Sequence, residues 1–461
     1  MTINTSLSPT DSASSQHEAL GSNPTTEKTL AIIGAGVVGL CCALQAQARG
    51  YQVTLFDRDL PGQGASFGNA GYLATELIDP LSTVDTLKQA PRLWLNPKGP
   101  VCLPWNHLLK VLPWLGRFIK AAHPDNARHS REALTQLNRE SVPAWQRLLS
   151  KVNAQDEIVH AGYLLVWESA QNKPAAQQHM RYMQAADIPC KYVEGEALVK
   201  LEPELAQQLS HGVFFPQACR VKDPYQLCET LFQAFTDQGG YFIQAEVKQL
   251  APETTQNNGV EKKQVQVKTD VVKTKTNKPL NNELSPEYRF DKAVLCTGAW
   301  GKKLLADLNL KVPLEAERGY HITLPKQQHK LKHAIGSAER RFVLTPLESG
   351  LRAVGMTELG GLKRGPIQRR FDVLKHHTQQ LLPALKPTIE KDCEQWMGHR
   401  PTLPDSLPVI DQHPEHSQLL FAFGNQHLGL TQAAATAELI LAISEQESPF
   451  MPTHYFSVSR F

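Results

Sequence analysis

Three glycines and one aspartate have the spacing of a dinucleotide site. Gly34, Gly36 and Gly39 form a GxGxxG pattern directly after an apolar run, and Asp57 ends the next apolar run. Such glycines allow a tight turn, close approach of a pyrophosphate to backbone amides, and close packing of a helix on a strand. A carboxylate after the second strand accepts a hydrogen bond from a ribose hydroxyl. The pattern therefore predicts dinucleotide binding.

The segment after Asp57 helps to separate FAD from a nicotinamide cofactor. Residues 65–73, ASFGNAGYL, supply small side chains and an asparagine where the chain can run beneath an extended dinucleotide toward a flavin ring. A nicotinamide-dependent reductase would need a place for a second nucleotide, and the sequence has no second GxGxxG. These features favour FAD, with a glycine-rich surface loop as the alternative interpretation of residues 65–73.

The elements that position these residues begin with a βαβ unit. Residues 29–57 have the pattern of a strand, a glycine turn, a helix and a second strand, which predicts a parallel sheet. Residues 81–211 have helical stretches that contain Trp and Pro, and they are expected to open a second domain. A polar stretch after residue 250 predicts a long surface hairpin. Other strand or helix patterns lie at 162–168, 241–250, 291–300, 318–324, 342–358 and 430–444.

Composition excludes several classes of protein. The 461 residues include 48 Lys and Arg against 45 Asp and Glu, so no basic footprint for nucleic acid is present. The eight cysteines are scattered without a CxxC pair, which predicts reduced thiols in the cytoplasm. Residues 1–28 lack an apolar signal core and are expected to form a disordered tail. HExxH does not occur, so a metal centre is disfavoured, and the one GxSxG match, GASFG at residues 64–68, lies in the small-residue segment after Asp57, so a nucleophilic triad is disfavoured too.

Several motifs occur in a recognisable order over nearly the whole chain. They are GAGVVG with Asp57, Asn69–Ala70–Gly71, VLCTGAW, GYHITL, WMGHRPTLPDSLPVI, FGNQHLGLT and the terminal SRF. This order resembles the D-amino-acid oxidase superfamily of flavoproteins, most closely the bacterial branch of D-amino-acid and D-hydroxyproline dehydrogenases. The resemblance implies an α/β, Rossmann-like FAD-binding domain and an α+β substrate-binding domain with an antiparallel sheet. The expected boundaries are 29–80, 212–306 and 395–461 for the first domain, and 81–211 and 307–394 for the second.

The motif and the resemblance together predict the residues that contact FAD. In the resembling proteins VLCTGAW returns to the cofactor sheet near the ADP moiety, and the backbone around Val247 flanks the adenine. The FGNQHLGLT loop leads into a helix whose N-terminal amides stabilise negative charge on the reduced flavin. The family usually has glutamate at the position of Asp57, so the carboxylate is retained. The predicted set is Gly34, Ala35, Gly36, Val38, Gly39, Asp57, Arg58, Asn69, Ala70, Gly71, Val247, Thr297, Gly298, Gly424, Leu428, Gly429, Leu430 and Thr431.

Arg400 is the predicted partner of a substrate carboxylate. A bidentate guanidinium is the best protein match for a carboxylate. Arg400 in GHRPTLPDSLPVI aligns with the arginine that the resembling glycine and sarcosine oxidases use in this way. His427 and Tyr320 are the other catalytic candidates. His321 follows Tyr320 on a strand, so at most one of these two should face the cavity. For each candidate, an ordinary structural role is the alternative.

The resemblance implies the oxidation of a D-amino acid or a cyclic amino acid. Hydride passes from the α-carbon to the flavin, and no protein acid or base is required. Hydrolysis of the imine gives a keto acid and ammonia, whereas a cyclic substrate gives a cyclic imine. Related oxidases often have a tyrosine where this chain has Phe342 and Val343, so the substrate cannot be transferred from them. An oxygen-using amino-acid or amine oxidase and a non-catalytic electron-relay subunit remain open, although a relay needs no carboxylate clamp.

Residues 107–122 form an amphipathic helical pattern. Its apolar positions are Leu108, Leu109, Leu112, Leu115, Phe118 and Ile119, and Lys110, Arg117 and Lys120 lie between them. The pattern suits a helix that lies on a membrane surface. The alternative is a helix packed on the protein's own core, or two such helices divided at Pro113. The resembling dehydrogenases pass electrons to a respiratory quinone. The expectation is a cytoplasmic protein in peripheral contact with the inner membrane.

Overall fold

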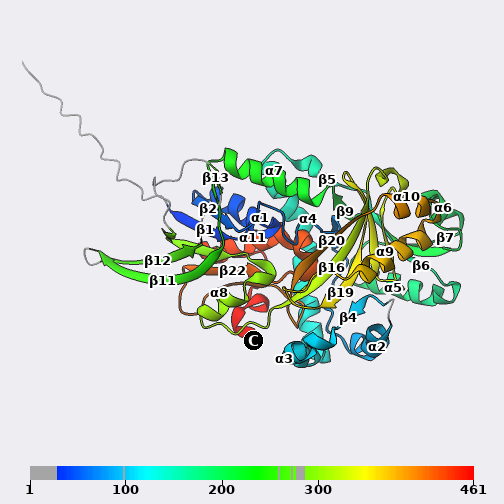
Figure 1. The fold of residues 1–461 in the computed structure, drawn as a ribbon, viewed down its shortest axis with the longest axis horizontal. Helices are drawn as coiled ribbons and strands as arrows, with labels where there is room; N and C mark the ends of the chain where they lie inside the picture. The colour runs from blue at the N-terminus through cyan, green and yellow to red at the C-terminus, as the bar shows by residue number, and fades with distance from the viewer. Residues whose placement is uncertain (1–27, 97–98, 258–259, 271–273, 277–285) are drawn as a thin grey trace, which may run out of the picture.

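The computed structural model describes residues 28–96, 99–257, 260–270, 274–276 and 286–461. The predicted disordered tail therefore lies outside the described residues, except for Lys28. The chain is a mixed α/β protein with two large sheets, as the sequence predicts (Figure 1). The division into domains with the expected boundaries stays a prediction.

The first sheet has five parallel strands at its centre. They are β10 (Tyr241–Gln244), β2 (Gln52–Asp57), β1 (Thr29–Ile33), β15 (Lys292–Leu295) and β22 (Leu419–Phe423), in that spatial order. Antiparallel strands β13 (Thr274–Thr276) and β21 (Val409–Gln412) form the two edges. The predicted βαβ unit is therefore the centre of this sheet, with β1 between β2 and β15.

The two faces of the first sheet are covered differently. Leu30 and Ile32 of β1 join a core with α1 (Val37–Gln47), α7 (Pro224–Asp237), α11 (Gly429–Glu445) and α4 (Pro124–Lys151). Ala31 and Ile33 point the other way. There they meet α8 (Lys302–Asp307) and a three-stranded sheet of β11 (Val247–Asn257), β12 (Val260–Thr269) and β14 (Glu287–Phe290). Successive side chains of β1 therefore point to opposite faces of the sheet and contribute to two hydrophobic cores, one on each face.

The second sheet is mostly antiparallel and carries the substrate-side motifs. Its path runs through β20 (Glu394–Thr402), β16 (Glu315–Leu324), β19 (Gly350–Leu359), β18 (Phe342–Leu347), β17 (Ala334–Ser337), β6 (Tyr163–Trp167), β8 (His211–Phe215) and β7 (Lys191–Glu194). β4 (Val101–Cys102) pairs with β19. Strands β8 and β20 lie largely within segments assigned to the FAD-binding domain but pair in this sheet.

Smaller elements complete the second half of the molecule. Helices α9 (Gln368–Leu381) and α10 (Lys386–Lys391) contribute to the core of the second sheet, and α5 (Lys173–Ala185) and α6 (Glu196–Leu201) lie near β7 and β8. Strands β3 (Tyr72–Leu73), β9 (Cys219–Val221) and β5 (Ile158–Val159) form a short third sheet. The predicted polar hairpin corresponds to β11 and β12, which project from the molecule in Figure 1.

Helices α2 (Val84–Leu95) and α3 (Trp105–Ala121) lie together at one side of the molecule (Figure 1). Helix α3 is continuous through Pro113, so the alternative of two helices is wrong. Within the part of the chain that the structure describes, no helix combines the length and apolarity needed to cross a bilayer.

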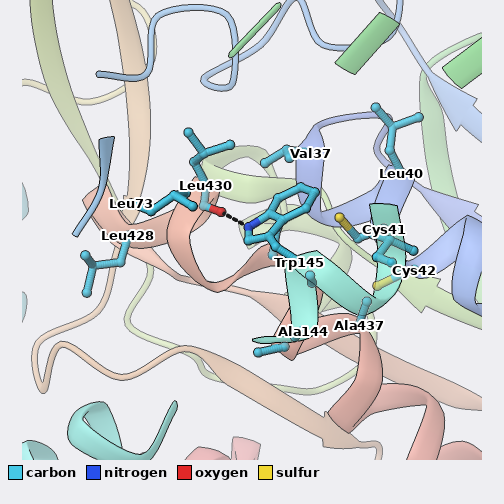
Figure 2. Packing of buried hydrophobic residues seen from close by; sticks show 14 of the residues in the cluster. Val37, Leu40, Cys41, Cys42, Leu73, Ala144, Trp145, Leu428, Leu430 and Ala437 are labelled. Carbon is cyan, nitrogen blue, oxygen red and sulfur yellow. Dashed lines mark hydrogen bonds between the residues drawn. The ribbon is translucent and has the colours of Figure 1, made fainter. Parts of the chain in front are cut away.

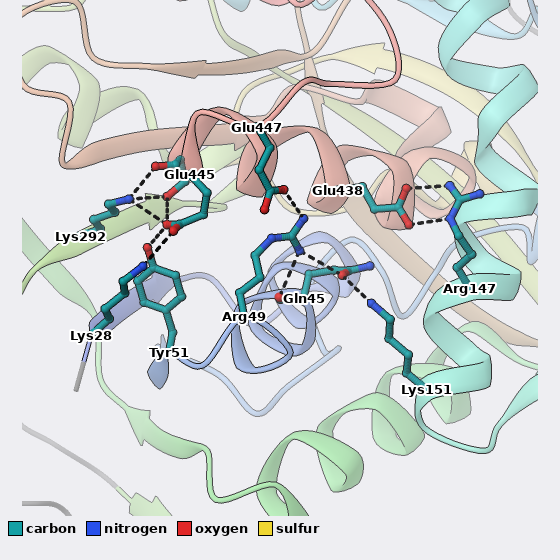
Figure 3. A network of polar contacts seen from close by, with 11 residues as sticks. Lys28, Gln45, Arg49, Tyr51, Arg147, Lys151, Lys292, Glu438, Glu445 and Glu447 are labelled. Carbon is teal, nitrogen blue, oxygen red and sulfur yellow. Dashed lines mark hydrogen bonds and ion pairs between the residues drawn. The ribbon is translucent and has the colours of Figure 1, made fainter. Parts of the chain in front are cut away.

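Polar contacts fasten the end of α11 to the first sheet. Glu445 accepts hydrogen bonds from Lys28 and Lys292, each at 3.0 Å, and from Tyr51 (Figure 3). These bonds join the C-terminal end of α11 to the chain at the starts of β1, β2 and β15.

Candidate active site

One elongated cavity of about 500 Å³ connects the two sheets. It runs from the glycine turn after β1 to the face formed by β16, β18, β19 and β20. Of the predicted cofactor residues, thirteen border it: Gly34, Gly36, Val38, Asp57, Arg58, Asn69, Ala70, Val247, Thr297, Gly298, Gly424, Gly429 and Leu430. Ala35, Gly39, Gly71, Leu428 and Thr431 do not border it. All three catalytic candidates, Arg400, His427 and Tyr320, do.

The three glycines of the turn have three different roles. Gly34 has a φ of +112°, and a Cβ there would lie 2.5 Å from the carbonyl oxygen of Cys296. A Cβ at Gly39 would lie 1.8 Å from the carbonyl oxygen of Gly34, so this glycine allows α1 to approach the turn. A Cβ at Gly36 would meet only Ser66 Oγ, at 3.3 Å, because the rest of its surroundings is cavity. Gly36 is therefore where a pyrophosphate can approach the backbone.

Asp57 lies at the carboxyl end of β2. Its carboxylate accepts hydrogen bonds from the backbone N–H groups of Ala35, at 2.7 Å, and Asp59, at 3.0 Å. Burial raises the pKa of Asp57, and these two bonds oppose that effect. A carboxylate has about four acceptor positions, so Asp57 can still accept from a ribose hydroxyl. Nearby, the Arg58 guanidinium stacks 4.2 Å above the Trp300 ring.

The second sheet holds the loop that contains Asn69. Arg352 on β19 donates to the carbonyl oxygens of Phe67, at 3.1 Å, and Asn69, at 2.9 Å. Trp396 on β20 packs so closely on Gly68 that a Cβ at this glycine would lie 1.8 Å from its ring. Arg352 and Trp396 were not predicted as site residues, because nothing in their local sequence indicates a contact with residues so far away in the chain.

His321 takes part in the same attachment rather than in the lining of the cavity. Its ring stacks on Trp396 with a centroid separation of 5.0 Å, and Nδ1 lies 3.2 Å from the carbonyl oxygen of Gly68. Burial, followed by the charge of Arg352, lowers the pKa of His321 to about 3. Tyr320 borders the cavity and His321 does not, as expected for neighbouring residues on one strand.

The N-terminus of α11 faces the cavity. A short 3-10 turn (Gln426–Leu428) leads into the helix, and Gly429 and Leu430 border the cavity. Trp145 of α4 donates to the Leu430 carbonyl oxygen at 2.9 Å (Figure 2). The first turn contains no acidic residue, so the positive end of the helix dipole is not offset there. This end of the cavity stabilises negative charge.

The side chains of two residues predicted to contact FAD at this helix have structural partners, whereas the prediction concerns their backbone amides. Leu428 packs in the hydrophobic core, and the Thr431 hydroxyl accepts a hydrogen bond from the Ala74 N–H at 3.0 Å. Figure 2 shows Leu430 beside the Trp145 indole, with Leu428 farther from it. The helix begins at Gly429, so the side chain of Thr431 is directed toward the β3 segment rather than toward the cavity.

Arg400 is held in the cavity wall by a buried carboxylate. Its Nη1 donates to Glu317 Oε1, at 2.8 Å, and to the Met356 carbonyl oxygen, at 3.2 Å. Glu317 also accepts from the hydroxyls of Thr357, at 3.0 Å, and Thr402, at 2.9 Å. Burial alone would raise the pKa of Glu317, but the charge of Arg400 and the hydrogen bonds from Arg400 and Thr402 lower it below the usual value. Glu317 is therefore charged near neutral pH and orients Arg400.

The guanidinium retains donors for a ligand. Within the described residues, Nε and Nη2 of Arg400 have no hydrogen-bond partner, and the side chain is 19% exposed. Gly319, opposite on β16, makes room for it, because a Cβ there would lie 2.5 Å from Arg400 Nη2. This arrangement can receive a carboxylate in the bidentate manner. Glu317 was not predicted, since a single acid in a strand gives no signal of its partner.

His427 is uncharged at neutral pH. Burial lowers its pKa to about 4; the charge of Glu317 acts in the opposite direction, and that of Arg400 adds to the lowering. Its imidazole therefore offers one donor and one acceptor nitrogen to the cavity.

Tyr320 has its hydroxyl committed elsewhere. The hydroxyl donates to Glu358 Oε2 at 2.6 Å, and Glu358 forms a fully buried ion pair with Arg318 at 2.7 Å. The geometry therefore gives less support to a catalytic Tyr320 than to Arg400 or His427. The wall beside it, with Phe342 and Val343, is apolar.

A parallel sheet with a glycine turn, opening into a cavity shared with an antiparallel sheet, defines a two-part dinucleotide-dependent enzyme. Residues 29–443 match the family model described as FAD dependent oxidoreductase (DAO). The protein belongs to this family of FAD-dependent oxidoreductases.

Relatives are similar over nearly their whole length. A D-amino-acid oxidase of Bradyrhizobium diazoefficiens is 29% identical, over 94% of this chain and 98% of the relative. A D-amino acid dehydrogenase of Vibrio vulnificus is 25% identical, over 91% and 97%. Among solved structures, glycine oxidase from Geobacillus kaustophilus has the same fold, with a TM-score of 0.68 and 18% identity over 94% of this chain and 98% of that chain.

The residues present fit FAD. Space is open above Gly36, Asp57 retains acceptor capacity, and the buried Thr297 hydroxyl at the cavity edge has no hydrogen-bond partner among the described residues. The particular residues that contact FAD stay a prediction.

We expect Gly36→Leu to abolish retention of FAD, because the new side chain would occupy the space above the turn. The FAD content per mole of purified protein measures this. Gly116→Leu is the matched control, since a Cβ at Gly116 meets nothing within 4 Å. If Gly36→Leu retained the FAD content of the wild type, the pyrophosphate could not bind above Gly36.

We expect the free energy of unfolding to fall as the pH is lowered from about 6.5 toward about 4, in part because of His427. Its pKa is lower in the folded chain than in the unfolded chain, so the unfolded chain binds the proton first. His427→Gln should reduce the slope by up to about 1.4 kcal/mol per pH unit. Urea unfolding at several pH values measures the slopes, with the exposed His329→Gln as control. An unchanged slope in His427→Gln would contradict this assignment.

Proposed function

We propose that the protein catalyses the oxidative deamination of a D-amino acid or a cyclic amino acid. The observation that carries this proposal is the Arg400 guanidinium in the cavity wall, which has donors left for a carboxylate and is oriented by Glu317. The names of the relatives support the same substrate class, since they include a D-amino-acid oxidase and a D-amino acid dehydrogenase.

The residues around the cavity have separable roles in this reaction. Bound FAD supplies the hydride acceptor. Arg400 binds the carboxylate and thereby orients the α-carbon. His427 is neutral and lies near Arg400 and Glu317, where it can accept a hydrogen bond from the substrate amine. The N-terminus of α11 stabilises the negative charge that accumulates on reduction. The substrate loses a hydride and a proton to become an imine. Water then hydrolyses the imine of a primary D-amino acid to a keto acid and ammonia, whereas a cyclic amino acid gives a cyclic imine.

Two rival functions give different results in one experiment. The purified holoenzyme is mixed without oxygen with D- and L-amino acids, hydroxyprolines and simple amines, and the flavin absorbance is followed. Bleaching by a D-amino acid or a cyclic amino acid supports the proposal. Bleaching by amines that lack a carboxylate, or by none of the compounds, contradicts it and favours an amine oxidase or an electron-relay subunit, respectively.

For the electron acceptor, we propose a respiratory quinone reached at the cytoplasmic face of the inner membrane. Helix α3 supports this because it has an exposed apolar face in addition to its packed face. Val111 and Trp114 are buried, and Leu108, Leu115 and Phe118 pack beside them. Trp105, Leu109, Leu112 and Ile119 are 73%, 81%, 47% and 58% exposed. The helix contains no acidic residue, and Lys110, Arg117 and Lys120 are exposed. An apolar face with basic flanks suits an anionic membrane surface.

We expect Arg400→Ala to keep FAD and to lose about 2–5 kcal/mol in transition-state stabilisation toward the amino acid identified above. Steady-state kcat/KM and the flavin spectrum measure the two properties. Because this change also leaves Glu317 without its charged partner, the double variant Arg400→Ala, Glu317→Gln is needed. It should remain as inactive as Arg400→Ala. Recovery of activity in the double variant, or near-normal kcat/KM in Arg400→Ala, would exclude Arg400 as the carboxylate ligand.

We expect Leu109→Asp together with Leu112→Asp to release the protein from membranes, because both side chains are exposed on α3 and would have to enter the headgroup region. The fraction that sediments with washed membranes should fall more than about tenfold. Leu60→Asp with Val199→Asp changes two exposed side chains elsewhere and is the control. A soluble wild-type protein that forms one hydrogen peroxide per turnover in air would instead be an oxidase.

A further inference from the structure

A second cavity, of about 530 Å³, lies between α3 and the segment that runs from α8 to β16. We call it the α3–α8 cavity. One wall consists of Lys110, Pro113, Trp114 and Arg117 of α3. The other wall consists of Lys302 and Ala306 of α8, followed by residues 309–315. The FAD-site motifs do not use this cavity, and the reaction proposed above does not need it.

The charge around the α3–α8 cavity is strongly unbalanced. Lys110, Arg117, Lys302 and Lys311 border it, and none of them forms an ion pair with another residue in the described ranges. Its single acid, Glu315, lies 3.2 Å from His107 Nε2. Elsewhere on the surface, lysines and arginines commonly have acidic partners, as Lys222 has in Asp156 and Arg289 has in Glu253. Four basic groups around one hollow therefore make a site for an anion.

The position of the cavity indicates the source of that anion. It shares α3 with the exposed apolar side chains of Trp105, Leu109, Leu112 and Ile119. If these side chains enter a bilayer, Lys110 and Arg117 lie at the depth of the lipid headgroups, and Lys302 and Lys311 approach from the protein side. Trp114 and residues such as Leu310 and Pro313 provide apolar surface for the glycerol part of a lipid.

We propose that the α3–α8 cavity binds the phosphate of an anionic phospholipid and so orients the protein on the membrane. This proposal rests on the membrane contact proposed above and adds its lipid chemistry. Glu315 at the α3–α8 cavity and Glu317 at the active-site cavity are two residues apart on β16. A lipid held here therefore brings the membrane close to the substrate end of the active site.

The first test compares vesicles of phosphatidylcholine with vesicles that also contain phosphatidylglycerol, using the FAD-loaded full-length protein. We expect selective sedimentation with phosphatidylglycerol. Lys302→Gln with Lys311→Gln should weaken that binding about 30-fold, because each basic group at an anionic surface strengthens it about fivefold. Both residues are outside α3, so the apolar face is unchanged. Lys386→Gln with Lys391→Gln, on the distant α10, is the charge-matched control (Figure 1).

The second test separates a defined site from diffuse electrostatic attraction. Ala306→Phe keeps the charge and places a ring in the cavity. Loss of the preference for phosphatidylglycerol in this variant supports the proposal, and retention of the full preference overturns it. The melting temperature is also measured with and without added inorganic phosphate, which tests for binding of a soluble phosphate. Stabilisation by phosphate without any binding to vesicles would assign the cavity to a soluble phosphate compound and would also overturn the lipid proposal.

The outcomes distinguish this proposal from those on which it rests. Equal binding to both kinds of vesicle would overturn the lipid site and leave the membrane contact of α3 in place. Absence of binding to any vesicle would overturn both. The bleaching of the flavin by the amino-acid substrate is measured in every variant; it should be unchanged, since none of the substituted residues borders the active-site cavity. If the wild-type protein binds the vesicles as expected but its flavin is not bleached by any amino acid, the result contradicts the proposed reaction and not the lipid site.

Discussion

The active-site cavity depends on the attachment of one cofactor-side loop to the opposite sheet. Arg352, buried on β19, donates to two carbonyl groups of this loop, and Trp396 and His321 pack against Gly68 beside them. A guanidinium with two such bonds in a buried setting has few alternative positions. The glycine turn and the substrate-side residues therefore face one another across a fixed space, although they come from different sheets.

The charged groups on the substrate side of the cavity are held in a defined arrangement. Glu317 is buried but ionised, because Arg400 and two threonine hydroxyls stabilise its negative charge. Burial, with the charge of Arg400, keeps His427 neutral against the opposing effect of Glu317. At the other side of the cavity, α11 directs its N-terminus inward, and Trp145 and Glu445 hold its two ends. The protein thus provides fixed electrostatics where substrate and reduced cofactor carry charge.

Local patterns predicted the parts of the fold that depend on periodicity and on glycine. The βαβ unit and the glycine turn follow from spacing, and most of the residues that spacing and family motifs predicted for the site border the cavity. Glu317 and Arg352 were missed, since their partners are distant in sequence and no local pattern specifies a pair across two sheets. Strand alternation separated Tyr320 from His321 but could not show that Glu358 binds the Tyr320 hydroxyl. In α3, the predicted apolar positions do not share one face. Leu108 and Leu115 pack inward with Val111 and Trp114, whereas Leu109 and Leu112 are exposed.

The ion pair between Arg400 and Glu317 has a consequence for discrimination among amino acids. An arginine alone would attract any anion, and a dicarboxylic compound most strongly. With an ionised Glu317 beside it, the local charge is close to balanced, so the attraction for a second negative group is removed. A zwitterion with a neutral side chain suits such a pair well, since its carboxylate meets the guanidinium and its ammonium adds no repulsion. Under the proposed function, acidic amino acids would be disfavoured through repulsion rather than through size.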